Sequence, residues 1–83
     1  MGGTKLTYPA IFIPHETGQG YTVEFVDLKG CVTEGDTLTE AIDMAVDAAT
    51  GWLLGEPAPK PTKNISDIEL EEKGSFVRFI DVK

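Results

Sequence analysis

Few side chains in this sequence are suited to covalent or acid–base chemistry. His15 is the only histidine and Cys31 the only cysteine. Nucleophilic catalysis requires a base beside the nucleophile and a third group that orients the base. His15 opens the polar run His15–Gly20, which predicts a hairpin loop with a solvated histidine. Cys31 lies beside apolar residues in a predicted strand, which indicates a buried, inert thiol.

Motifs that mark common catalytic or metal sites are also absent from the sequence. It contains no phosphate-binding glycine loop, no Gly-x-Ser-x-Gly turn, no Cys-x-x-Cys pair and no His-Glu-x-x-His run. We therefore expect a protein that is not an enzyme and needs neither a cofactor nor a metal ion.

The balance of charge narrows the range of partners. Asp and Glu number 14 against 7 Lys and Arg, which gives a net charge of −7. Proteins bind nucleic acids largely by neutralising phosphates with Lys and Arg, so direct DNA or RNA binding is not expected. An acidic domain suits a basic protein partner. Composition alone is equally consistent with acidity that only keeps a small domain soluble.

The length of 83 residues predicts a single domain over residues 1–83, with a loose segment at 1–4. No apolar run is long enough to form a transmembrane helix. The first residues lack the apolar stretch of a signal peptide. Because one cysteine cannot form an internal disulfide, the expected location is the reducing cytoplasm.

Three strands are predicted before the first helix. Lys5–Pro14 is apolar on both parities, as is typical of a central strand covered on both faces. Pro9 favours an edge or a bulge instead, but the apolar run outweighs it. Alternation over Tyr21–Phe25 indicates a second, half-buried strand, and Cys31–Glu34 indicates a short third one.

A helix is predicted over Thr37–Leu54. Thr37 and Glu40 fit a capping box, in which the hydroxyl accepts an orphan N–H and the carboxylate accepts the N–H of Thr37 itself. Gly55 is expected just past the helix end. An apolar stripe recurs at spacings of three and four and comprises Leu38, Ala41, Ile42, Ala45, Ala49, Trp52 and Leu53.

The segment after the helix is Pro-rich over residues 55–63, which predicts an extended connector inside the domain. A short turn or strand is expected within 64–73, because long structureless connections are uncommon in compact domains. Ser75–Val82 is the last predicted strand, apolar on both parities and so central or covered by a partner. Together these elements predict an α+β fold of β-β-β-α-β order, with a mixed, mainly antiparallel sheet and one helix on one face. The last strand is expected beside the first and parallel to it.

The centre of the chain also resembles a known family. Gly20–Ala45, GYTVEFVDLKGCVTEGDTLTEAIDMA, is similar to the HicB-like antitoxin signature GY-x-V-x-F-x-DL-x-GC-x-T-x-GDT-x-x-EA. Tyr8-Pro9-Ala10 resembles the YPA of that family's first strand. The resemblance implies the abbreviated ribonuclease H-like fold that the HicB-like domain is said to share.

A nuclease-like fold raises the question of metal-dependent cleavage. Two-metal hydrolysis needs several carboxylates around ions about 3.5–4 Å apart, and in ribonuclease H one of these comes from the middle of the first strand. Leu6–Ile13 contains no Asp or Glu, although Glu40, Asp43 and Asp81 lie on the predicted helix and last strand. We expect no metal-dependent nuclease activity.

The resemblance implies a protein-binding module that neutralises a small, basic, RNA-cleaving HicA-like toxin by masking its active surface. The toxin contacts are expected among acidic side chains on the second and third strands and their turns, namely Glu24, Asp27, Glu34 and Asp36. The alternative is a stand-alone oligomeric assembly module without a toxin partner. Longer family members carry a C-terminal DNA-binding domain that represses their own operon. The sequence given stops at Lys83, so operator binding is not expected to carry over.

Self-association is expected because the first and last strands carry apolar residues on both faces of the sheet, and one helix can cover only one face. The residues on the face that the helix leaves open are Ile11, Ile13, Val77 and Phe79. Large exposed apolar patches are uncommon on soluble monomers, and two-fold assembly is the commonest way to cover them. The sequence therefore predicts a homodimer or a multiple of dimers.

Overall fold

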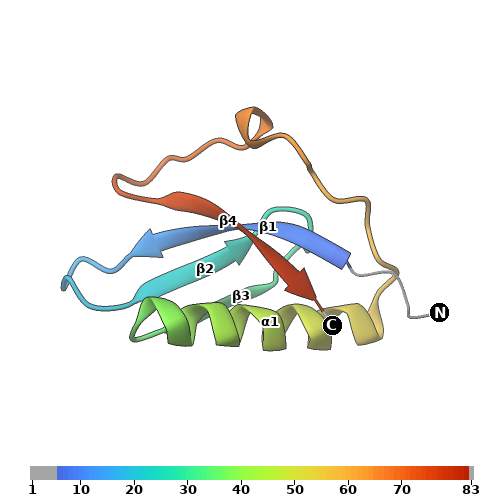
Figure 1. Cartoon of the computed structure of the whole chain (residues 1–83), viewed down its shortest axis with the longest axis horizontal. Helices are drawn as coiled ribbons and strands as arrows, with labels where there is room; N and C mark the ends of the chain where they lie inside the picture. Colours follow the sequence, from blue (N-terminus) through green and yellow to red (C-terminus); the bar gives the residue numbers. More distant parts are fainter. Residues whose placement is uncertain (1–5, 83) are drawn as a thin grey trace.

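One long helix packs along one face of a four-stranded antiparallel sheet (Figure 1). The computed structural model describes residues 6–82, so the expectation for residues 1–4 lies outside the described part. The predicted β-β-β-α-β order and α+β class are confirmed. In chain order the elements are β1 (Leu6–Pro14), β2 (Tyr21–Phe25), β3 (Val32–Gly35), α1 (Leu38–Gly55), the 3-10 turn η1 (Ile65–Asp67) and β4 (Phe76–Val82).

The strand order β3-β2-β1-β4 places β1 at the centre of the sheet, as its two apolar faces predicted. Pro9 is compatible with this position. Its carbonyl accepts a hydrogen bond from Val26 N at 3.2 Å, at a point where β2 has already ended at Phe25. The missing N–H of the proline therefore lies beyond the β1–β2 ladder, where little pairing is lost.

The predicted direction of β4 is wrong. β4 lies beside β1 as expected, but it is antiparallel to β1, with a register from Leu6↔Val82 to Phe12↔Phe76. It is also an edge strand rather than a central one. A short connection after α1 would have entered β4 parallel to β1. Residues 56–75 instead run back along the sheet before β4 begins (Figure 1).

The length of this connection makes the reversed direction possible. About ten extended residues span roughly 33 Å, and the nine residues of β1 rise about 30 Å. Residues 56–75 are therefore long enough to return along the sheet. The short turn expected within residues 64–73 is confirmed, because η1 lies there.

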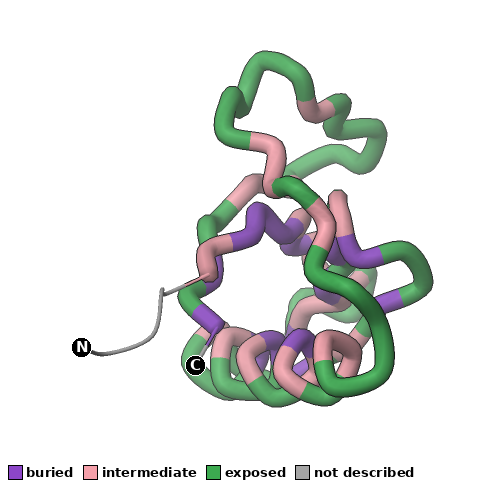
Figure 2. The backbone as a smooth tube through the Cα atoms, turned by 90° about the vertical axis from the view of Figure 1, so that its right-hand side faces the viewer, coloured by how far each residue is buried: buried purple, intermediate pink, exposed green. Residues whose placement is uncertain are grey.

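The core lies between α1 and the facing side of β1 and β2 (Figure 2). Ala41, Ala45 and Ala49 are fully buried, and their small side chains let the helix approach the sheet closely. The other members of the predicted helical stripe pack against this core, which confirms the stripe. Cys31 is buried, and burial raises the pKa of its thiol, as expected of an inert cysteine.

The N-terminus of α1 differs in one detail from the predicted capping box. Thr37 Oγ1 accepts a hydrogen bond from Glu40 N at 3.0 Å, as expected. Glu40 Oε1 accepts its bond from Asp36 N at 2.6 Å, one residue before the predicted donor. At the other end Gly55 is the last helical residue, and Glu56 is the C-cap in extended conformation.

Gly35, the last residue of β3, allows the closest approach between sheet and helix. A Cβ at Gly35 would lie 2.5 Å from Ala41 N and 2.6 Å from Ala41 Cα. Both are backbone atoms within a helix and cannot move independently. Only glycine therefore fits this position, which matches the Gly-Asp-Thr run of the sequence.

We predict that Gly35→Ala lowers the free energy of unfolding by about 1–3 kcal/mol, the usual effect of overpacking. Gly51→Ala is a matched control, because its Cβ would enter open space on α1, where Ala stabilises a helix by up to about 1 kcal/mol relative to Gly. Urea midpoints at unchanged slope measure both changes. Equal midpoints for Gly35→Ala and the wild type would contradict the close approach.

Candidate protein-binding surface

The face of the sheet turned away from α1 has a polar half and an apolar half. Residues facing α1 on β1 and β2, such as Tyr8 and Val23, are buried, so their neighbours along each strand point to the other side. The polar half is made by Thr22, Glu24 and Glu34 of β2 and β3, and the apolar half by Ile11, Ile13, Val77 and Phe79 of β1 and β4.

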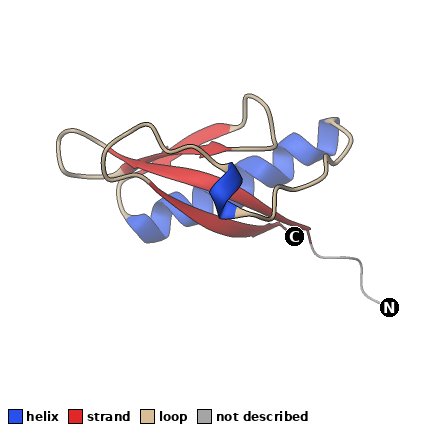
Figure 3. Cartoon of the chain, turned by 90° about the horizontal axis from the view of Figure 1, so that it is seen from above, coloured by secondary structure: helices blue, strands red, loops and turns tan. Residues whose placement is uncertain are grey.

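Residues 56–75, called the strap below, arch over the apolar half (Figures 1 and 3). They line hollows together with Ile11, Ile13 and Phe79. Ile11, Ile13 and Val77 are half-buried, and Phe79 is 40% exposed. The four residues therefore share one face as predicted, but this chain covers part of that face itself.

Two sets of hydrogen bonds fasten the start of the strap to the sheet. Thr62 N and Thr62 Oγ1 donate to the two carboxylate oxygens of Asp27, each at 2.8 Å. Tyr8 OH donates to Pro59 O at 2.6 Å. Further along, Ile65 is 53% exposed and Leu70 is 43% exposed, so much of the strap faces solvent (Figure 2).

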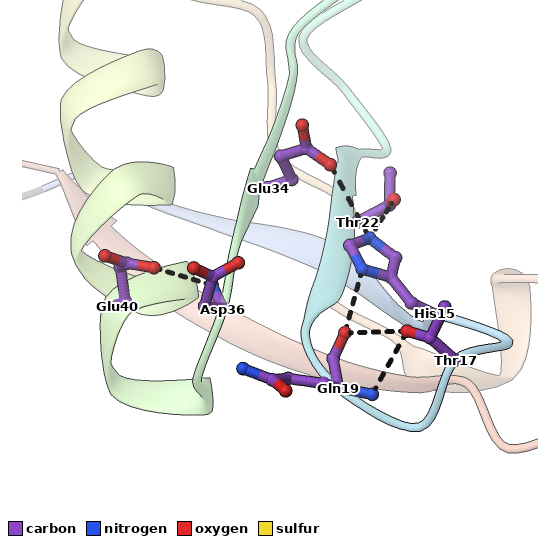
Figure 4. Close-up of polar contacts among 7 residues, drawn as sticks. All are labelled: His15, Thr17, Gln19, Thr22, Glu34, Asp36 and Glu40. Atoms are coloured by element: carbon purple, nitrogen blue, oxygen red, sulfur yellow. Dashed lines mark hydrogen bonds and ion pairs between the residues drawn. The ribbon is translucent and has the colours of Figure 1, made fainter.

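The structure brings together two of the four acidic residues expected to contact a toxin. Glu24 and Glu34 are exposed on the polar half of the open face. Asp27 lies in the turn after β2, where Thr62 occupies both of its oxygens. Asp36 immediately precedes the cap of α1, where its N–H donates to Glu40 (Figure 4). Only Glu24 and Glu34 therefore form one surface.

His15 is not the solvated side chain that the sequence predicted. Its Nδ1 lies 3.1 Å from Gln19 O and its Nε2 lies 3.0 Å from Thr22 Oγ1 (Figure 4). Since the Gln19 carbonyl can only accept, the Nδ1–H of His15 donates to it. Nε2 also lies 3.6 Å from Glu34 Oε1. His15 thus joins the hairpin loop to the polar half of the open face.

Three acidic residues that the sequence analysis did not select also reach the open face. Glu69, Glu71 and Glu72 of the strap line a hollow whose other walls include Glu24 and whose floor holds Ile11 and Ile13. The acidic run of residues 69–72 was visible in the sequence. Its position over β1 depends on the path of the strap, which no local pattern encodes.

The described residues meet neither the requirements of a metal site nor those of a membrane-spanning helix. Within residues 6–82 no three His, Cys, Asp or Glu side chains converge in a way that could hold a metal ion. In the same part of the chain no helix has the length and apolar character needed to cross a bilayer.

A single helix on a four-stranded antiparallel sheet, with an acidic and partly apolar open face, defines a small α+β domain suited to binding another protein. The family model described as HicB_like antitoxin of bacterial toxin-antitoxin system matches residues 8–82. The chain therefore belongs to the HicB-like antitoxin family, and the resemblance seen around Gly20–Ala45 is confirmed.

A named relative agrees with this assignment. The chain is 46% identical over 44 residues to Antitoxin HicB 1 of Photorhabdus laumondii, a match that covers 53% of this chain and 28% of that protein. The chain therefore matches little more than a quarter of that relative's length.

Two solved structures share the fold. A chain of a toxin–antitoxin complex from Streptococcus pneumoniae superimposes with a TM-score of 0.74 and 21% identity, over 96% of this chain and 70% of that one. The N-terminal domain of Burkholderia pseudomallei antitoxin HicB gives a TM-score of 0.72 and 21% identity, over 94% and 99%. Kinship with ribonuclease H stays a prediction.

We predict that Asp27→Ala loosens the strap, because it removes both hydrogen-bond acceptors of Thr62. Loss of a hydrogen bond to a charged group costs about 1.5–3 kcal/mol, so exchange of the Thr62 amide should accelerate at least tenfold. Asp36→Ala is the control: it also removes one carboxylate, but that carboxylate forms no hydrogen bond with the strap. It should leave the exchange rate of the Thr62 amide unchanged. NMR-detected hydrogen exchange measures both rates, and equal protection in Asp27→Ala would refute the fastening.

Proposed function

We propose that this chain acts as an antitoxin module that binds a small, basic, RNA-cleaving toxin of the HicA-like kind and masks its active surface. Membership of the antitoxin family supports the role. The observation that carries the mode of binding is the open sheet face, where Glu24 and Glu34 are both exposed. Masking by occupancy needs no catalysis, and we propose that the chain is not an enzyme.

The polar half of the open face supplies the two kinds of contact that such an interface needs. Glu24 and Glu34 lie on adjacent strands as diagonal neighbours, about 7–8 Å apart at their backbones. Val32 lies opposite Glu24 and is 55% exposed, so it can serve as an apolar anchor. Charges at such a surface mainly raise the association rate and select the partner, while buried apolar contacts supply much of the affinity.

We predict that Glu24→Lys and Glu34→Lys each slow association with the HicA-like product of an adjacent gene by roughly tenfold, equivalent to about 1.4 kcal/mol. Asp43→Lys makes the same charge change on the exposed side of α1 and should have little effect. Surface plasmon resonance at two salt concentrations measures the rates. Added salt should slow association more than it speeds release.

The outcomes of this experiment separate the surface from the function. If both Lys variants bind with wild-type kinetics, the proposed face is not the toxin-binding surface, but the antitoxin role still stands. Absence of binding, together with no rescue of growth when toxin and chain are co-expressed, would remove the antitoxin role itself. An assembly module without a toxin partner would then be the better description.

We also propose that the chain forms homodimers through the edge of the sheet at β4. Phe79 is 40% exposed and lines a shallow hollow with Leu6 and Pro61. β4 is an edge strand, and unpaired strand edges readily pair with another chain. This location leaves Glu24 and Glu34, on the far side of β1, free for a toxin.

We predict a dimeric mass, or a multiple of it, for the wild-type protein by light scattering at micromolar concentration. Phe79→Asp should shift the mass to that of the monomer, because it places a charge in the apolar contact. Leu54→Asp is the control, since Leu54 is 86% exposed at the end of α1 and outside the proposed contact. A monomeric wild type, or a dimer that survives Phe79→Asp, would rule out this interface.

A further inference from the structure

The hollow between the strap and β1 is more enclosed than the shallow hollow beside Phe79. Its floor holds Ile11 and Ile13, and its volume is about 320 Å³. This lies at the lower end of the range for ligand pockets, about 300–1,000 Å³. The hollow is therefore large enough for one long side chain of a partner and too small for most larger ligands.

The walls of the hollow are acidic on two sides. Glu24 projects from β2, while Glu69, Glu71 and Glu72 come from the strap. No Lys or Arg forms an ion pair with these carboxylates within residues 6–82. The four carboxylates therefore place negative charge around an apolar floor, and no ion pair among the described residues offsets it.

The strap is fastened to the sheet at its start and ends in a hydrogen-bonded turn. Asp27 and Thr62 fasten its start. At its other end Ser75 N and Ser75 Oγ both donate to Glu72 O, which closes a turn just before β4. A segment fastened at its start and closed by a turn at its end loses less conformational freedom when a ligand enters than a free loop does, and such preorganisation favours binding.

We propose that this hollow receives an arginine side chain presented by a basic partner protein. The aliphatic stem of arginine packs on apolar surface while its charged end stays among polar groups, which matches the Ile11 and Ile13 floor. The planar guanidinium carries five donors and is more weakly hydrated than an ammonium group, so it can face carboxylates from β2 and the strap at once. This inference rests on the proposed function, because it names the chemistry by which the partner is held.

The test uses a peptide in place of the unidentified partner. Acetyl-Gly-Arg-Gly-amide is titrated into protein with labelled isoleucine methyl groups, and NMR follows their chemical shifts. We expect saturable shifts of Ile11 and Ile13, whereas Ile42 on α1 and Ile80 on the buried face stay unmoved. The same peptide with citrulline keeps the shape without the charge and should give no saturable shift.

A pair of variants tests the acidic wall. Glu71→Gln combined with Glu72→Gln should weaken the arginine peptide roughly fivefold, as expected for the loss of two partly exposed charge contacts. Asp43→Asn combined with Asp47→Asn removes the same charge from the exposed side of α1 and should leave the affinity unchanged.

Three results would overturn the inference: unmoved Ile11 and Ile13 signals, equal response to the citrulline peptide, or unchanged affinity in the Glu71→Gln, Glu72→Gln variant. Because the peptide contains no toxin, these results do not depend on whether the chain neutralises one. If a toxin binds normally to the protein but the arginine peptide does not bind in the hollow, only the proposal for the hollow is refuted.

Discussion

The contact between Gly35 and Ala41 is the constraint on which the rest of the architecture depends. The backbone of β3 passes so close to the first turn of α1 that no side chain fits between them. The helix begins only a few residues after β3 and must lie back across the sheet at short distance. Its alanine stripe then closes over β1 and β2. α1 ends at the opposite end of the sheet from where it begins, and residues 56–75 return along the sheet before β4 forms antiparallel to β1.

That return gives the strap its two roles. A domain of this size has a modest core and needs additional cover over its second sheet face. The strap provides part of that cover while leaving Ile65 and Leu70 largely exposed. It also carries acidic residues over the sheet, next to Glu24 of β2. The segment that completes the fold is thus also the one that shapes the surface.

Local patterns predicted the elements well but not their long-range arrangement. Alternation in β2, the stripe of α1 and the cap at Thr37 depend on neighbours within a few residues, so the sequence shows them directly. The direction of β4 depends on the path of residues 56–75, and no periodicity records that path. The role of His15 was missed for a similar reason, since its partner Thr22 is set by the hairpin geometry. Asp27, one of the expected toxin contacts, accepts hydrogen bonds from Thr62, which lies 35 positions away and so beyond any local pattern.

The pairing of β1 with β4 has a consequence for the order in which the molecule can be made. β1 forms at the start of the chain, yet one of its two edges is completed only by residues 76–82. During synthesis on the ribosome, β1, β2, β3 and α1 emerge first, with the central strand still open along one side. Pairings between residues so distant in sequence form late and slowly, and an open strand edge invites contact with other chains. The finished hollow and its acidic wall therefore exist only after the last strand has been translated and has docked.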